Sequence, residues 1–405
     1  MKILMLAQFF PPDIGGEERH VLNLANALVA RGHQVVVGTQ LLPGTDRVET
    51  LPGGVVVHRF TSSAMRLGAR YSDPHRPHHL PLPDPALTTA LNRLVERVRP
   101  DVVHAHNWIV NSAVALRRRY PFKLVLTLHD YSNVCATKRM MRDGRPCPGP
   151  GARCLPCAGG HYGTVVGAGT ALAVKAMHRW KDHAVDHIVS VSNAVAQRNG
   201  VPGGPVPSSV IPNFVPDTVA ELIEHADNPD LPPGDFLFFA GDLLRDKGVP
   251  TLLDAYQRLG AGRPPLVMVG RRSPAVPDEL PAGVRVFEQW THPRVMAAFR
   301  RCTLAVLPST WPDPCPTTVL EAMAAGRPVI TTSTGGMVDM VQDGVSGVLV
   351  APGDAAALAK AIGRLLADPG LRDRLGDAGR ARVEHFTASS VAARVEKVYQ
   401  EVMAA

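Results

Sequence analysis

The stretch DPCPTTVLEAMAAGRPVITTSTGG, from Asp313 to Gly336, carries the pattern that decides the fold. Two acidic residues, Asp313 and Glu321, stand eight positions apart. Glu321 is expected to open a helix of small residues, which leads through an arginine–proline pair into an apolar strand and then a pair of glycines. Carboxylates accept hydrogen bonds from sugar hydroxyls, and the free N–H groups at a helix start favour phosphate. A site with both suits a ligand that carries a sugar and a phosphate.

The size and composition of the chain indicate a globular protein with two domains. A length of 405 residues exceeds that of most single cores, and 45% of the residues are hydrophobic and 20% charged. A net charge of +7 is compatible with nucleic acid, anionic lipid or phosphorylated ligands. The densest basic run, residues 117–119, follows an apolar stretch and suits the polar end of a helix. The favoured interpretation is therefore solvated charge, with no nucleic-acid partner.

Three features bear on the cellular compartment. No apolar run reaches the roughly 18 residues that a membrane-spanning helix needs. The N-terminal sequence MKILMLAQFFPP suits a first buried strand better than a signal peptide. Six cysteines in a chain of this length do not form the disulfide framework of a small secreted protein. These features together predict a cytoplasmic protein.

Both halves of the chain alternate short apolar runs with helical patterns, which predicts two parallel sheets covered by helices. Strands are expected at 2–7, 35–38, 100–106, 122–128 and 187–191, and again at 236–240, 265–269, 284–287, 304–307 and 348–350. The proline-rich stretch 216–234 is interpreted as the linker between the halves. Ligands of such sheets bind beyond the carboxyl ends of the strands.

In the first half, a glycine pair and several histidines fall at these strand ends. Gly16 follows Gly15 between the first strand and the first helix, where the backbone can approach an anionic ligand closely. The missing third glycine argues against NAD. His104, His106 and His129 end two strands, and a neutral imidazole there can hydrogen-bond a sugar hydroxyl. A lone histidine of this kind is usually structural, and among the three His129 is the predicted ligand.

In the second half, the motif GDLLRDKG places Arg245 and Lys247 directly after a strand. Two cations beside a helix start would clamp a pyrophosphate, although Asp242 and Asp246 also fit a solvated loop of mixed charge. The sequence contains no Asp-x-Asp motif of the kind that holds a sugar diphosphate through Mg²⁺ or Mn²⁺. The cations and helix dipoles are expected to replace a metal.

The two acidic residues of the opening stretch have a structural and a functional interpretation. As helix-capping acids each would stabilise a helix end by about 0.5–1 kcal/mol. As ligand groups, one would accept the ribose hydroxyls and the other would face the sugar. The functional interpretation is favoured, more strongly for Glu321 than for Asp313. Thr317 and Thr318, just ahead of Glu321, complete the predicted donor-binding residues.

Two further clusters have metal-ligand side chains. Cys154 and Cys157 have zinc-knuckle spacing, Cys147 precedes them closely, and the fourth ligand would be Cys135 or His161. The pattern permits a structural zinc, but free thiols or an oxidised pair are favoured. A proline-rich stretch from 64 to 85 contains three histidines that could bind a metal, and a solvated loop is favoured there: His75, His78 and His79.

The whole series of motifs resembles the family-four retaining glycosyltransferases. The segments PPDIGGEERHVLNLANALVARGHQV, DVVHAH, TLHDY, VSVSN and VIPN recur in order, as do GDLLRDKG, LPST, EAMAAGRPVITTSTGG and DGVSGVLVAPGD. The resemblance implies an α/β protein with the GT-B fold, in which two doubly wound Rossmann-like domains face a central cleft. The expected domains are residues 1–215 on the acceptor side and 216–387 on the nucleotide-sugar side. A C-terminal helix of about 388–405 is expected to cross back to the first domain.

The resemblance also implies roles for single residues. Lys247 corresponds to the phosphate-binding lysine, Glu321 to the ribose-binding glutamate, and His129 to the histidine near the donor sugar. Gly16 corresponds to the loop glycine near the phosphate and the acceptor. Two departures stand out. Asp313 replaces a glutamate, which shortens the side chain by one methylene. Asp242 stands where an arginine is common, and Arg245 is the candidate replacement.

The implied activity is the retaining, metal-independent transfer of a hexosyl group from a nucleotide diphosphate sugar to a hydroxyl acceptor. UDP is expected as the donor nucleotide by assumption and is not inferred from the sequence. The sequence also identifies neither the sugar nor the acceptor. A GT-B nucleotide-sugar epimerase and a non-catalytic sugar-nucleotide-binding protein stay as alternatives. Peripheral membrane contact through residues 117–119 or the segment LAVKAMHRWKDH is a further alternative to plain solvated helix faces.

Overall fold

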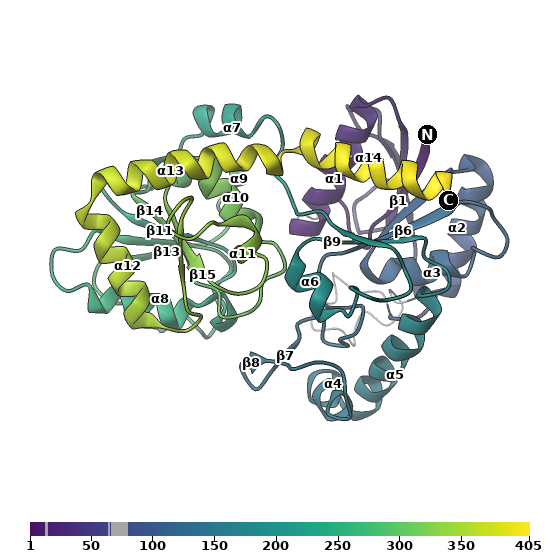
Figure 1. The fold of residues 1–405 in the computed structure, drawn as a ribbon, viewed down its shortest axis with the longest axis horizontal. Coiled ribbons are helices and arrows are strands. Elements are labelled where there is room, and N and C mark those ends of the chain that lie inside the picture. The colour runs from purple at the N-terminus through teal and green to yellow at the C-terminus, as the bar shows by residue number, and fades with distance from the viewer. Residues whose placement is uncertain (13–14, 64, 66–79) are drawn as a thin grey trace. The chain divides into compact units, whose positions relative to one another are not determined.

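The computed structural model describes residues 1–12, 15–63, 65 and 80–405. The chain forms two compact units (Figure 1). Unit 1 comprises residues 1–212 with 391–405, and unit 2 comprises residues 213–390. Within the described residues, no helix is both long and apolar enough to span a membrane.

Unit 1 is built on an eight-stranded sheet in the order β10-β9-β6-β5-β1-β2-β4-β3. All neighbouring strands run parallel except β3, which is antiparallel to β4. The central strands read as continuous apolar runs because helices cover both faces of a parallel sheet. The strands are β1 (Lys2–Leu6), β2 (Gln34–Gln40), β3 (Val48–Thr50), β4 (Val56–Phe60), β5 (Val102–His106), β6 (Lys123–Leu128), β9 (His187–Ser190) and β10 (Ser208–Val210).

Two helices of unit 1 begin at a residue whose side chain accepts a hydrogen bond from the first turn. Asp84 caps α2 by accepting from the N–H of Leu87 at 2.9 Å, and Pro85 occupies its first turn. A short hairpin of β7 (Met141–Arg142) and β8 (Arg145–Pro146) precedes two helices that pack against each other. The helices are α1 (Gly16–Ala30), α2 (Pro85–Val98), α3 (Val110–Val114), α4 (Cys154–Tyr162), α5 (Thr164–Lys181), α6 (Asn193–Arg198) and α14 (Ala388–Ala404).

The C-terminal helix α14 begins in unit 2 and continues from residue 391 as part of unit 1. Its buried face includes Val391, Val395 and Tyr399. The Tyr399 hydroxyl lies 2.6 Å from Nδ1 of His104 in β5, and the carboxylate of Glu396 lies 2.9 Å from Nε2 of His33. A buried apolar face and these polar contacts fix the helix to unit 1.

Unit 2 is a six-stranded, all-parallel sheet in the order β13-β12-β11-β14-β15-β16. Strands β11, β12, β14 and β15 are buried along their whole length. The strands are β11 (Leu237–Ala240), β12 (Leu266–Val269), β13 (Val284–Phe287), β14 (Leu304–Leu307), β15 (Val329–Thr332) and β16 (Val348–Val350). The helices are α7 (Val219–His225), α8 (Val249–Arg258), α9 (His292–Arg301), α10 (Thr317–Ala324), α11 (Met337–Met340), α12 (Ala355–Ala367) and α13 (Pro369–Val383).

Three expectations about local structure need correction or fall outside the described residues. The stretch 216–234 is not a plain linker, because α7 lies inside it and buries Val219 and Ile223. Residue 64 and residues 66–79 are outside the described part of the chain, and the metal-binding alternative for His75, His78 and His79 falls there. The helix expected to open at Glu321 begins four residues earlier, at Thr317.

Candidate functional site

In unit 2 the predicted residues gather where the order of the strands reverses. The sheet runs outward from β11 through β12 to β13 on one side and from β14 through β15 to β16 on the other. The loops after β11 and β14 therefore flank the switch point, where open α/β sheets bind ligands. Lys247 lies in the loop after β11, and Asp313 lies in the loop after β14.

Lys247 and Asp313 form an ion pair in which the lysine ammonium donates a hydrogen bond to the aspartate carboxylate. The carboxylate is almost fully buried and the lysine side chain is 28% exposed. The ammonium also lies 5.4 Å from the centre of the Trp311 ring, a cation–π contact. Lys247 thus presents its charge at the switch point with a fixed direction.

Backbone contacts lock these two loops together. The N–H groups of Thr310 and Trp311 donate to the carbonyl of Asp246 at 2.9 and 3.0 Å. Gly248 has a φ of +81°, and a Cβ there would lie 1.8 Å from the carbonyl oxygen of Pro308. Only glycine fits that approach. The loop that carries Lys247 is therefore held by the loop that leads to Asp313.

The glycine pair of the opening stretch packs directly on Asp313. Gly335 has a φ of +60°, and a Cβ there would lie 2.3 Å from the Asp313 carbonyl oxygen. The N–H of Gly336 donates to that oxygen at 2.7 Å. These glycines are needed to position the backbone of Asp313, a role that the sequence pattern alone did not separate from phosphate binding.

Glu321 lies in the interior of α10, so the helix-capping interpretation is wrong for it. Its carboxylate is buried and lies 2.8 Å from Nε2 of His292, the first residue of α9. Thr317 and Thr318 form the first turn of α10 and are half-buried. Lys247 and Asp313 pair with each other while Glu321 pairs with His292, so the two acids have separate partners.

The two predicted phosphate cations are not equivalent in the structure. Arg245 is exposed, and its side chain forms no hydrogen bond or ion pair with the described residues. The carboxylate of Asp242 accepts from the guanidinium of Arg271 at 3.0 Å. Arg271 follows β12 and is a cation near this loop that sequence reasoning missed; its signal was the arginine pair directly after the strand-ending Gly270.

In unit 1 three histidines meet at the carboxyl ends of the strands. His20 on α1, His106 at the end of β5 and His129 after β6 have ligand nitrogens within 4.8 Å of one another. Nδ1 of His106 lies 2.8 Å from Nε2 of His129. The ligand nitrogens are close enough together to hold a metal ion. The three histidines could equally form a hydrogen-bonded chain that orients His129.

Burial keeps these imidazoles neutral. It lowers the pKa of His106 and of His129 well below the usual value, with neighbouring histidines adding to the effect. Burial likewise lowers the pKa of His104 to about 3. A neutral imidazole both donates and accepts, which suits contact with a sugar hydroxyl.

Two further polar residues of this site were missed. Asn107 has a φ of +55° and bridges two groups: its Oδ1 accepts from the N–H of His129 at 3.1 Å, and its Nδ2 donates to Glu17 at 2.7 Å. Burial raises the pKa of Glu17 to about 8, and the carboxylates of Glu18 and Asp130 raise it further. Glu17 is thus a carboxyl group that can carry a proton near neutral pH.

Gly16 is the first residue of α1. A Cβ added there would meet no described atom within 4 Å, whereas one at Gly15 would lie 2.5 Å from the carboxylate of Glu18. A side chain at 15 would displace the end of the Glu18 side chain, whereas the described residues leave space at 16.

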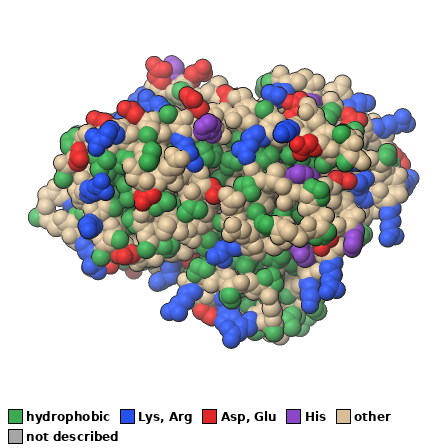
Figure 2. Space-filling view, viewed as in Figure 1, with side chains coloured by type: hydrophobic (Ala, Val, Ile, Leu, Met, Phe, Trp, Pro, Cys, Tyr) green, Lys and Arg blue, Asp and Glu red, His purple; other side chains and the backbone are tan. Residues whose placement is uncertain are grey.

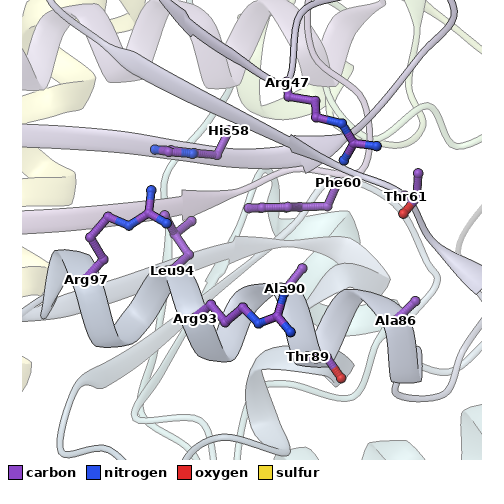
Figure 3. A pocket seen from close by; sticks show the side chains of 10 residues that line it. All are labelled: Arg47, His58, Phe60, Thr61, Ala86, Thr89, Ala90, Arg93, Leu94 and Arg97. Carbon is purple, nitrogen blue, oxygen red and sulfur yellow. The ribbon is translucent and has the colours of Figure 1, made fainter.

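Unit 1 also has a cavity away from the cluster of His20, His106 and His129. It measures about 350 Å³ and opens between β4 and α2, where Arg47, Arg93, Arg97 and His58 line it without an acidic residue (Figure 3). None of the predicted site residues lines it. Its positive charge suits an anionic group. Burial lowers the pKa of His58, and the charge of Arg97 also acts to lower it.

Comparison with known proteins places the chain among sugar-transferring enzymes. Residues 14–219 match the family described as Glycosyltransferase Family 4, and residues 224–382 match Glycosyl transferases group 1. The chain is 31% identical to a glycogen synthase from Mycobacterium tuberculosis over 98% of its own length and 94% of the relative's. It is 29% identical to a D-inositol 3-phosphate glycosyltransferase from Arthrobacter, with 92% and 86% covered.

Solved structures agree on the architecture. Sucrose-phosphate synthase from Thermosynechococcus elongatus superposes with a TM-score of 0.76 at 21% identity, over 100% of this chain and 99% of that one. Anabaena HepE in complex with UDP-glucose gives a TM-score of 0.69 at 17% identity, over 99% and 100%. The fold is therefore GT-B, as predicted. The chain belongs to glycosyltransferase family 4.

Proposed function

We propose that the protein transfers a hexosyl group from a nucleotide diphosphate sugar to a hydroxyl acceptor, with retention of the anomeric configuration and without a metal ion. The observation that carries this proposal is the lysine ammonium held at the switch point of unit 2 by Asp313. Glu321, buried in the neighbouring helix, supports it as a ribose ligand. The absence of an Asp-x-Asp motif from the sequence supports metal independence.

In this proposal Lys247 and Asp313 act one after the other during donor binding and reaction. Lys247 holds Asp313 before the donor arrives and turns its charge to the pyrophosphate when the donor binds. In the reaction the bond between the anomeric carbon and the phosphate oxygen breaks, and the positive charge stabilises the departing nucleotide diphosphate. The acceptor hydroxyl attacks from the same face, and the departing phosphate oxygen takes its proton. Asp313 is then free to face the sugar, and neutral His129 orients it.

A donor panel tests this activity. The protein is incubated with UDP-, GDP- and ADP-sugars, each with and without a mixture of hydroxyl acceptors, and products are followed by NMR. Transfer that retains the anomeric configuration and is unchanged by added Mn²⁺ supports the proposal. Inverted product would exclude retention, and a rate that depends on Mn²⁺ would exclude metal independence.

The same panel separates the alternatives. An epimerase needs acid–base carboxyl groups in unit 1, and Glu17, with its raised pKa and its neighbours Glu18 and Asp130, gives that alternative a specific basis. Epimerised sugar nucleotide without transfer would favour it. Binding of a donor without any turnover would favour a non-catalytic sugar-nucleotide-binding protein.

We predict that Arg245→Ala lowers kcat/KM about tenfold, because one exposed cation near the phosphates contributes roughly 1.4 kcal/mol. Steady-state kinetics with the best donor of the panel check this. Arg271→Ala is the matched variant, since Arg271 is an exposed cation of the neighbouring loop. If Arg245→Ala leaves donor affinity and turnover unchanged, Arg245 does not replace the missing arginine.

We also propose that α5 contacts anionic membranes. Val165, Val166, Leu172 and Trp180 of this helix are 85%, 55%, 60% and 38% exposed. Residues 138–183 hold eight lysines and arginines against two aspartates, and Figure 2 shows basic side chains gathered over this part of unit 1. Arg117 is a weaker candidate because it is paired with Asp186 at 2.8 Å.

Liposome sedimentation checks the membrane contact. Binding is expected to rise with the fraction of anionic lipid and to fall at least severalfold in Val165→Asp/Leu172→Asp, since both apolar contacts and net charge favour an anionic surface. Val345→Asp changes a valine of unit 2 that is 56% exposed, close to the 60% of Leu172; it is the control and should bind as the unmodified protein does. Binding that does not depend on anionic lipid would exclude this contact.

A further inference from the structure

Four cysteines of unit 1, none of them part of the histidine cluster, line one cavity of about 440 Å³. We propose that this cavity is a zinc site in which Cys135, Cys147, Cys154 and Cys157 are the four ligands. The site would join the turn after β6, the end of the β7–β8 hairpin and the first turn of α4.

The backbone presents the thiols from three separate points. The N–H of Cys135 donates to Tyr131 O at 2.9 Å within the turn, and the N–H of Cys147 donates to Met140 O at 2.7 Å across the hairpin. Cys154 and Cys157 are the first and fourth residues of α4, and residues three apart lie on one face of a helix. Two ligands from a helix turn and two from loops are the usual composition of a tetrahedral zinc site.

The cavity also decides between the two candidates for the fourth ligand. Cys135 lines it together with the other three cysteines. His161 instead lines a neighbouring cavity, which it shares with Cys157 alone among the four. The expected ligand set is therefore four thiolates.

This part of the chain needs a cross-link because it buries little apolar surface. The local cluster consists of Trp108, Ala136, Ala158 and Val174, three of which have small or medium side chains. The segment from Cys147 to Arg153 reads CPGPGAR and offers no large apolar residue. Where a core is this small, a structural metal commonly supplies the missing stability.

The four thiols have to draw together when the metal binds. Among the described residues, the group of ligand atoms already within 4.8 Å is the histidine cluster, so the sulfurs are spaced more widely. Rotation of a cysteine between staggered rotamers moves its sulfur by about 3 Å, which is enough to close such gaps.

Metal analysis of the full chain, purified without chelator and under reducing conditions, tests the site. About one zinc per chain is expected, and the doubly substituted Cys154→Ser/Cys157→Ser chain should lose it. Substitution with Co²⁺ should give the thiolate-to-cobalt charge-transfer bands and the d–d bands of a tetrahedral tetrathiolate. Cys302→Ser, which changes a buried cysteine of unit 2, should keep both zinc and spectrum.

Three more variants keep the test decisive. His106→Gln should retain the metal if the cysteines bind it. Loss of zinc in that variant would instead place the metal on the histidines. Cys135→Ser should lose metal and His161→Ala should keep it, which checks the ligand set even if the double variant folds poorly. The inference is overturned if the unmodified chain neither carries zinc nor takes up Co²⁺ with thiolate bands, or if mass spectrometry shows the four cysteines as disulfides.

Discussion

Lys247→Ala is expected to lower kcat/KM for the nucleotide-sugar donor by about 10³-fold, roughly 4 kcal/mol of transition-state stabilisation. The substitution removes the ammonium that would neutralise the departing pyrophosphate. It also leaves the almost fully buried carboxylate of Asp313 without the lysine that pairs with it, and we expect this charge to repel the donor phosphates. Repulsion of the donor by that carboxylate raises KM, and loss of the cation lowers kcat. Steady-state kinetics at several donor concentrations measure both effects.

A double variant separates these two contributions. Lys247→Ala/Asp313→Ala should recover part of the KM defect and none of the kcat defect, because it removes the repulsion without restoring the cation. Lys360→Ala changes an exposed lysine of α12 in the same unit and should leave both parameters unchanged. A loss of less than about threefold in kcat/KM for Lys247→Ala would remove this lysine from the proposed mechanism.

Acid is expected to unfold unit 1 below about pH 6.5, because three of its histidines are buried in the neutral form. The pKa of His104 is lowered to about 3, and the pKa values of His106 and His129 lie well below the ordinary value. The unfolded chain takes up protons near pH 6.5 while the folded chain does not, so the stability is present above that pH and is lost as the pH falls. Three protons correspond to about 4 kcal/mol per pH unit.

Urea unfolding of unit 1 between about pH 7 and pH 5, followed by pulse proteolysis, measures this dependence. His104→Gln should be less stable at neutral pH, because it perturbs the contacts with Tyr399 and Thr127, but it should lose stability less steeply by one proton. His225→Gln, at an exposed position of unit 2, should leave the slope unchanged. A flat profile would mean that the folded chain protonates these histidines.

The sequence predicted the two parallel sheets well because fully buried strands have a simple signal. β11, β12 and β14 are short apolar runs, each followed at once by a glycine or a proline, and β15 begins with two apolar residues after Pro328. Such runs in alternation with helical patterns point to one architecture. Lys247 and Asp313 could be assigned to one site because both follow strands whose carboxyl ends meet at the switch point. Order along the chain was sufficient for those predictions.

Other parts of the site depend on contacts that order along the chain does not encode. His292 meets Glu321 only because α9 and α10 pack together, and the two residues, 29 positions apart, are linked by no sequence pattern that predicts the pair. Asn107 bridges His129 and Glu17 from a left-handed backbone conformation. The start of α10 was misplaced because Thr317 and Thr318 have modest helix propensity and only the packed loop before them fixes the first turn.

The division of the chain also constrains how the protein is made. Unit 2 is complete once residue 390 has been synthesised, whereas unit 1 still lacks residues 391–405 at that point. Domains generally fold as units while the chain emerges, in the order in which they are completed. The first 212 residues must therefore wait on the ribosome with the surface that receives Val391, Val395 and Tyr399 still open to solvent. The half of the protein that is synthesised first is the last to finish folding.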